Sequence, residues 1–235
     1  MCSQGLTLYD GYLYEGTGLH GASELRKLDP KNPSNVLQKH SLSSEFFGEG
    51  ITYYKDRKGN HRMIQLTWRE KVVFIYDADS FELIKQVEFE TSTGEGWGIS
   101  FIDNTCEFVV SDGSELLMFW DCETLEELRR IEVKFYQNNE IKNVKFLNEL
   151  EVVRLGKEQY SILANVWFES AIVQIDPSSG DVERIHLFNS LYPNKTKVDE
   201  VFNGISIAEE ENHSILYLTG KLWHSMYKVK LNIAN

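Results

Sequence analysis

The chain has 235 residues, of which 42% are hydrophobic and 26% are charged, and its formal net charge is −12. This length and composition fit one globular domain with its own core and exclude a disordered chain. The negative charge disfavours nucleic acids and anionic membrane surfaces as partners, because both would repel the protein. We therefore expect a protein that binds neither nucleic acid nor membrane.

The cysteines and histidines show no metal-binding pattern. Cys2, Cys106 and Cys122 form an odd set without a Cys-x-x-Cys pair, so we expect free thiols rather than a disulfide framework or a zinc site. The six histidines are scattered, and we expect neither a metal nor another cofactor. As written, the first residues lack a secretory signal and are typical of a cytosolic chain, although this leaves the compartment undetermined.

A short phrase recurs five times along the chain: a polar residue, then Gly or Glu, then an apolar residue that opens an alternating segment. The five copies begin at Gln4, Glu49, Glu95, Asn148 and Asn203. A second apolar segment follows each copy, and in four copies a third segment ends at an aspartate that is suited to a hairpin turn. These third segments cover residues 25–29, 72–77, 117–121 and 172–176.

Four strands per repeat, at a spacing of about 40–50 residues, are typical of a propeller blade. The sequence predicts an all-β protein, a five-bladed β-propeller, in a single domain of residues 1–235 with blades opening near residues 4, 49, 95, 148 and 203. Helical periodicity is nearly absent, and residues 125–130 are its best candidate. The fifth repeat reaches only a third segment, near residues 226–231, so we expect a last blade of three strands with an exposed edge.

The first strand of a propeller blade lines the central channel, and the loops from strand 2 to strand 3 surround the same mouth as the phrase openings. Two carboxylates, three carboxamides, a lysine and several indoles should therefore converge there, which is typical of a small-molecule site. The lysine and indoles are Lys221, Trp68, Trp97, Trp167 and Trp223. We expect one of the two glutamates to cap backbone amides, and Trp120 to pack between blades. Two acids across a channel also fit glycoside hydrolysis, and many propellers only bind.

The phrases together resemble the plant-type glutaminyl cyclases. The matching phrases, in order through all five repeats, are Gln4-Gly-Leu, Glu49-Gly-Ile-Thr, Leu66-Thr-Trp, Glu95-Gly-Trp-Gly, Leu147-Asn-Glu-Leu-Glu, Asn165-Val-Trp and Thr219-Gly-Lys. The resemblance implies a five-bladed propeller that converts the N-terminal glutamine of peptides or proteins into pyroglutamate with release of ammonia, without a catalytic metal. We expect it to act as a monomer.

The resemblance also implies roles for individual residues. Glu49 is the implied catalytic acid/base. The residues that would line the substrate pocket are Gln4, Asn148, Lys221, Trp68, Trp97 and Trp167. The chain departs from the family where Cys2-Ser3 replaces the usual Phe-Thr before Gln4. The alternative is a catalytically inactive propeller that binds peptides or glycans at the same mouth, and the presence of all the implied residues favours the enzyme.

Overall fold

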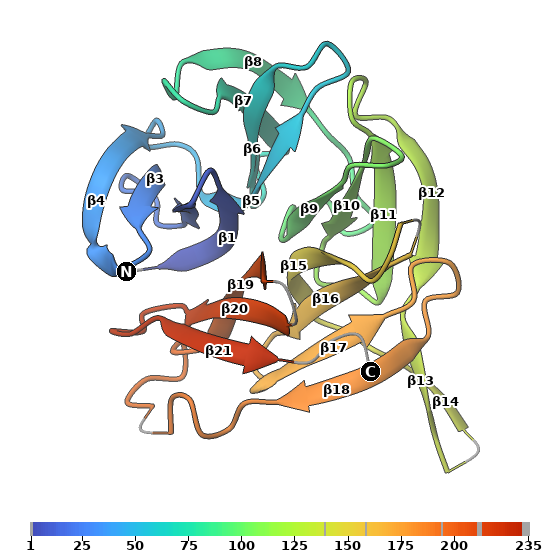
Figure 1. Ribbon diagram of the computed structural model, residues 1–235. Coiled ribbons are helices and arrows are strands. Elements are labelled where there is room, and N and C mark those ends of the chain that lie inside the picture. The colour runs from blue at the N-terminus through green and yellow to red at the C-terminus, as the bar shows by residue number, and fades with distance from the viewer. Residues whose placement is uncertain (1, 139, 158, 194, 211–212, 232–235) are drawn as a thin grey trace.

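The computed structural model describes residues 2–138, 140–157, 159–193, 195–210 and 213–231. Five small antiparallel sheets stand around a central axis, each with its earliest strand innermost (Figure 1). The expected five-bladed β-propeller is thereby confirmed. The described residues form no helix, and therefore none long and apolar enough to cross a membrane.

Each blade follows the chain order of its strands. Blade 1 contains β1 (Ser3–Tyr9), β2 (Tyr12–Thr17), β3 (Glu24–Asp29) and β4 (Asn32–Ser41). Blade 2 contains β5 (Gly48–Lys55), β6 (His61–Thr67), β7 (Val72–Asp77) and β8 (Leu83–Glu88). Blade 3 contains β9 (Ile99–Ile102), β10 (Glu107–Ser111), β11 (Leu116–Asp121) and β12 (Glu127–Glu132). Blade 4 contains β15 (Leu147–Arg154), β16 (Tyr160–Val166), β17 (Ala171–Ile175) and β18 (Val182–Leu187).

Blade 5 has three strands among the described residues, as expected from the short fifth repeat. They are β19 (Phe202–Glu210), β20 (His213–Gly220) and β21 (Tyr227–Leu231). The candidate helix at residues 125–130 is wrong, because residues 127–130 belong to strand β12 and residues 125–126 are irregular. An extra hairpin of β13 (Lys134–Gln137) and β14 (Glu140–Asn143), which no repeat pattern predicts, projects from the ring between blades 3 and 4 (Figure 1).

The core is divided into clusters that lie between neighbouring blades. Trp120, expected to pack between blades, contacts Phe89 at a ring distance of 5.6 Å in the cluster that joins blades 2 and 3. Blades 5 and 1, which close the ring, share a smaller cluster whose fully buried members are Leu6, Leu13 and Leu28. Since buried apolar area supplies most of the stabilising free energy, we infer that ring closure depends more on polar contacts than the other blade interfaces do.

Two buried glutamates of β15 provide such polar contacts across the channel. The Glu149 carboxylate accepts hydrogen bonds from the backbone amides of Leu6, at 3.2 Å, and Ile205, at 2.8 Å. The Glu151 carboxylate accepts one from the amide of Ile207 at 2.9 Å. These bonds connect blade 4 to blades 1 and 5, so the Leu-Asn-Glu-Leu-Glu phrase contributes to ring closure as well as to the channel mouth.

The burial of Glu151 predicts an unusual pH dependence of stability. Burial raises the pKa of Glu151 to about 8, although the Ile207 amide opposes the shift. The folded protein therefore holds this proton more tightly than the unfolded chain does, whose glutamates titrate near about 4.3. The resulting stabilisation is complete below that unfolded pKa and is lost as the pH rises toward 8.

We expect Glu151→Gln, which mimics the protonated acid, to reduce this pH dependence by at least about 1.4 kcal/mol, the equivalent of one pKa unit. Urea unfolding of both proteins at pH 5.5 and pH 8.5 measures the difference. The same slope in the two proteins would show that Glu151 does not hold an extra proton in the folded state.

A disulfide joins Cys106 to Cys122, so the expectation that these two cysteines are free thiols is wrong. Their Cα atoms are 5.3 Å apart, and the amide of Cys122 donates a hydrogen bond to the carbonyl of Cys106 at 3.0 Å. The physical reason is strand register. Glu107 pairs with Asp121 in the antiparallel β10–β11 pair. Cys106 directly precedes Glu107 and Cys122 directly follows Asp121, so the register places the two cysteines opposite each other.

Removal of this disulfide should destabilise blade 3 without changing the channel mouth, because the bond lies at the opposite ends of the strands. Closing a loop of this length stabilises a fold by about 3 kcal/mol. The variant Cys106→Ala/Cys122→Ala should therefore lower the melting temperature by about 6–12 °C, as measured by circular dichroism. Cys2→Ala, which removes the free thiol, serves as the control. An unchanged melting temperature in the double variant would contradict a stabilising role for the bond.

Candidate active site

A cavity of about 390 Å³ opens at the end of the ring where the innermost strands begin. Seven of the eight expected site residues line it: Gln4, Glu49, Trp68, Trp97, Asn148, Trp167 and Lys221. Glu95, whose carboxylate was also expected at the mouth, lines it too, and the structure adds four lining residues: Phe47, Arg69, Asp199 and Val201. All five blades contribute, as the convergence of the repeated phrases predicts.

Glycines in the repeated phrases allow the innermost strands to approach so closely. A side chain on Gly50 would place its Cβ 2.5 Å from the carbonyl oxygen of Trp97, and one on Gly98 would lie 2.1 Å from that of Asn148. The amide of Gly50 donates to the Trp97 carbonyl at 2.8 Å. Backbone contact between successive blades therefore sets the spacing of Glu49, Trp97 and Asn148 around the mouth.

Glu49 is a buried acid in the wall of this cavity, with only 6% of its surface exposed. Burial raises the pKa of Glu49 well above its ordinary value, and the nearby carboxylates of Glu95 and Glu70 add to the shift. The ammonium of Lys221 acts in the opposite direction. A carboxyl group in this setting is suited to proton transfer, because its raised pKa makes its carboxylate a stronger base than that of an exposed glutamate.

Glu95 binds the indoles of the cavity wall. One oxygen, Oε2, accepts hydrogen bonds from Nε1 of Trp68 at 2.8 Å and from Nε1 of Trp97 at 2.9 Å. The other oxygen accepts one from Nε of Arg69 at 2.7 Å. Burial opposes ionisation, but the bonds from Trp97, Arg69 and Trp68 hold the pKa of Glu95 below its ordinary value. Glu95 is therefore the glutamate with a structural role, although it orients indoles rather than capping backbone amides.

Asn203 determines how Gln4 presents its carboxamide. The Nδ2 group of Asn203 donates to the backbone carbonyl of Gln4 at 3.4 Å and to its Oε1 at 3.2 Å. A backbone carbonyl only accepts hydrogen bonds, so the Asn203 group that faces it must be the amino group, Nδ2. The same Nδ2 group faces the Gln4 side chain, so the end of the Gln4 carboxamide that points toward Asn203 is the oxygen, Oε1. This leaves the Nε2 group of Gln4 as the donor that its carboxamide can offer to a ligand in the cavity that it lines.

Trp223 does not belong to the cavity, contrary to the expectation from its position in the loop after the second strand. Its indole is 5% exposed and stacks on Tyr192 and Phe202 at ring distances of 4.6 and 5.6 Å. The indole lies directly over Gly220, where an added Cβ would come within 2.4 Å of the ring. The chain therefore folds back after β20, and Trp223 joins the core between blades 4 and 5.

Of the lining residues that the sequence analysis did not predict, two are close to the repeated phrases and two come from an irregular segment. Phe47 stands two positions before Glu49, and Arg69 directly follows Trp68, so extending the phrases would have included them. Asp199 and Val201 come from the long connection between β18 and β19. That connection carries no periodic pattern that could predict its path over the mouth.

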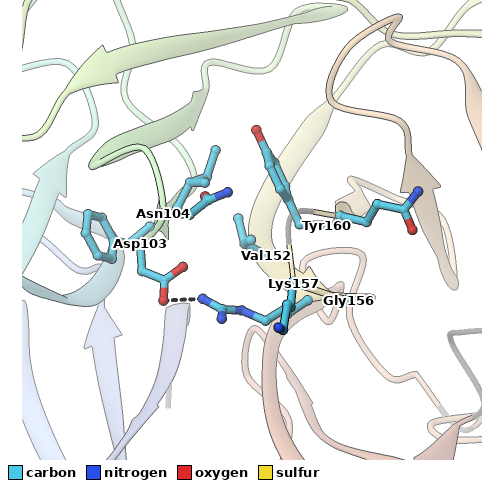
Figure 2. A pocket seen from close by; sticks show the side chains of 10 residues that line it. Asp103, Asn104, Val152, Gly156, Lys157 and Tyr160 are labelled. Atoms are coloured by element: carbon cyan, nitrogen blue, oxygen red, sulfur yellow. Dashed lines mark hydrogen bonds and ion pairs between the residues drawn. The ribbon is translucent and has the colours of Figure 1, made fainter.

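A second hollow, of about 180 Å³, lies at the opposite end of blades 3 and 4. Figure 2 shows Asp103 and Asn104, from the turn after β9, across from Val152 and Tyr160 of β15 and β16. Its acid and its arginine pair with each other, since Arg154 binds the Asp103 carboxylate. Unlike the cavity at the channel mouth, this hollow is lined by no tryptophan and no buried acid.

The fold and cavity together define a class of protein: a β-propeller with a small-ligand site of one buried acid, a lysine, carboxamides and indoles at its channel mouth. Within the described residues, no group of three or more histidine, cysteine, aspartate or glutamate side chains could hold a metal ion. The family model for glutamine cyclotransferase matches residues 2–231, so the chain belongs to the glutamine cyclotransferase family.

Individual relatives agree with this membership. The chain is 32% identical over 240 residues to the glutaminyl-peptide cyclotransferase of Arabidopsis thaliana, an alignment that covers 99% of this chain and 68% of the relative. The crystal structure of Myxococcus xanthus glutaminyl cyclase superposes with a TM-score of 0.80 at 26% identity, covering 99% of this chain and 91% of the other. The WD40 propeller domain of Doa1, at 10% identity and a TM-score of 0.55 over 96% of this chain and 62% of the other, shares the fold alone.

Proposed function

We propose that this protein is a glutaminyl-peptide cyclotransferase, which converts the N-terminal glutamine of peptides or proteins into pyroglutamate and releases ammonia. The observation that carries the proposal is the buried Glu49 carboxyl beside Lys221 in a cavity walled by indoles. Family membership and the names of the two relatives supply the reaction, and the cavity supplies groups suited to each of its steps.

In the proposed reaction, the neutral α-amine of the substrate attacks its own γ-carboxamide carbon, and a new C–N bond closes a five-membered ring. Glu49, as the carboxylate, accepts the proton that the attacking amine loses. It then donates this proton to the amide nitrogen, which leaves as ammonia when the original C–N bond breaks. One group can serve both steps because the reaction transfers one proton from the attacking to the leaving nitrogen.

Other cavity residues would stabilise the tetrahedral intermediate and hold the glutamine side chain in the conformation that allows attack. The ammonium of Lys221 and the carboxamides of Gln4 and Asn148, which line the cavity, would donate hydrogen bonds to the carbonyl oxygen as it becomes an oxyanion. Trp68, Trp97 and Trp167 would contact the methylenes of the glutamine. Because attack is intramolecular, holding the side chain folded back supplies a large part of the acceleration.

Glycoside hydrolysis is less well supported by the same site. It requires a second carboxyl group that is free to act as base or nucleophile. Glu95 is the carboxylate that acts most strongly on Glu49, and both of its oxygens are occupied by Trp68, Trp97 and Arg69. Glu95 is therefore not free to act as a base or nucleophile, and the proposed reaction, which moves a single proton, requires only Glu49.

Ammonia release from a peptide that begins with glutamine tests the proposal. We expect release from this peptide and none from the same peptide with an acetylated N-terminus, whose nitrogen cannot attack. Dialysis against a chelator should leave the rate unchanged, because the proposal includes no metal and assigns the proton transfer to Glu49. Binding of the peptide by folded protein without ammonia release would instead support the non-catalytic propeller.

A further inference from the structure

Aromatic side chains continue from the cavity onto the outer surface of blade 4. Trp167 of the cavity wall stacks on Phe168 at a ring distance of 4.2 Å, and Phe146 lies 6.5 Å from the same indole. Phe168 is 51% exposed and Phe146 48% exposed. We call Phe146, Trp167 and Phe168 the aromatic ledge. It joins the cavity directly, because Trp167 also contacts Trp97 edge-to-face at 5.2 Å.

The backbone holds both phenylalanines of the ledge in a strained conformation. Phe146 has a φ of 62° and Phe168 a φ of 70°, in the left-handed region that bulky residues avoid. Phe81 and Leu125 adopt similar φ values, but their side chains are buried in the core, which offsets the strain. No such burial compensates Phe146 and Phe168, so the fold presents two large apolar rings to solvent at a cost in free energy.

The ledge is the aromatic part of the blade 4 rim. Elsewhere the rim carries charged groups, among them Arg69 of blade 2 and Asp199 of the connection before blade 5. A substrate whose glutamine occupies the cavity must pass its following residues out through this mouth. An extended peptide advances about 3.3–3.6 Å per residue, so its second or third side chain can reach Phe168 from a glutamine held near Trp97.

We infer that the aromatic ledge is a binding site for an apolar side chain in the second or third residue of the substrate. This inference rests on the proposed cyclotransferase function and specifies which peptides that function favours. An aromatic or branched aliphatic side chain there gains contacts with two rings that are already fixed in place. An acidic side chain gains none of these contacts and loses hydration.

The test compares kcat/KM for three peptide amides, Gln-Phe-Ala, Gln-Ala-Phe and Gln-Ala-Ala, in wild type and in Phe146→Asn/Phe168→Asn. Asparagine tolerates the left-handed backbone, so the double variant should fold. We expect one or both Phe-containing peptides to exceed Gln-Ala-Ala by about three- to tenfold in wild type, and this advantage to vanish in the variant. Tyr136→Asn, which removes a 63% exposed ring from the projecting hairpin, should keep the wild-type preference.

Two outcomes would overturn the inference. They are equal turnover of the three peptides by wild type, and an advantage that survives in the double variant. Free glutamine amide, which has no side chain to reach the ledge, should react equally well with both proteins, whereas a general disturbance of Trp167 would slow it in the variant. Failure of wild type to convert any peptide would contradict the proposed function itself, so the two failures are distinguishable.

Discussion

Glu49→Gln is expected to lower kcat by about 10²–10⁴-fold while the protein still binds its peptide, because positioned acid/base groups contribute rate factors of this size. The glutamine keeps the size and the hydrogen-bonding shape of the side chain but cannot carry the transferred proton. Steady-state kinetics and peptide binding, measured on the same preparation, separate the two effects.

Glu70→Gln is the matched control for this variant. It removes a carboxylate that also raises the pKa of Glu49 but that does not line the cavity. We expect this variant to retain most of the activity. Because the pKa of Glu49 falls when Glu70 is removed, the acid limb of the pH–rate profile should move to slightly lower pH. Activity of Glu49→Gln within about threefold of wild type would exclude Glu49 as the acid/base.

Lys221→Met is expected to lower kcat by about 10²–10³-fold, the usual effect of losing one donor to an oxyanion. It also changes the charge beside Glu49. Since Lys221 lowers the pKa of Glu49, its removal should raise that pKa and shift the acid limb of the pH–rate profile to higher pH. The pH profile of kcat/KM measures this shift, which a loss of packing alone would not produce.

Lys71→Met serves as the control, because Lys71 also lies in a loop between the second and third strands but pairs with Glu90 at 2.9 Å. It should leave both kcat and the pH profile unchanged. A wild-type rate and pH profile in Lys221→Met would contradict both roles of Lys221: the hydrogen bond to the oxyanion and the lowering of the pKa of Glu49.

The repeated phrases predicted most of the cavity lining because they lie at the beginnings of the innermost strands. In a closed ring all such openings must meet at one mouth, so Gln4, Glu49 and Asn148 could be placed together from spacing alone. The same argument failed for Trp223. It placed the whole loop after β20 at the mouth, but the direction of one side chain depends on local packing over Gly220, which the repeat pattern does not contain.

Other features depend on register and on irregular segments. The cysteine count predicted free thiols, whereas the pairing of Glu107 with Asp121 brings Cys106 and Cys122 together. Asp199 reaches the cavity from a long connection without periodicity. The hydrogen bond from Trp68 of blade 2 to Glu95 at the start of blade 3 likewise follows from the closed ring and from no local signal.

Mass spectrometry of a peptide whose N-terminal glutamine carries ¹⁵N in the side-chain amide tests the central claim most directly. The account predicts that folded protein converts it to a pyroglutamyl peptide that has lost the label, with ¹⁵N-ammonia as the second product. Loss of the label with gain of a glutamate side chain would indicate hydrolysis by water. That result, or recovery of the intact labelled peptide from an excess of folded protein, would contradict cyclisation by the peptide's own amine.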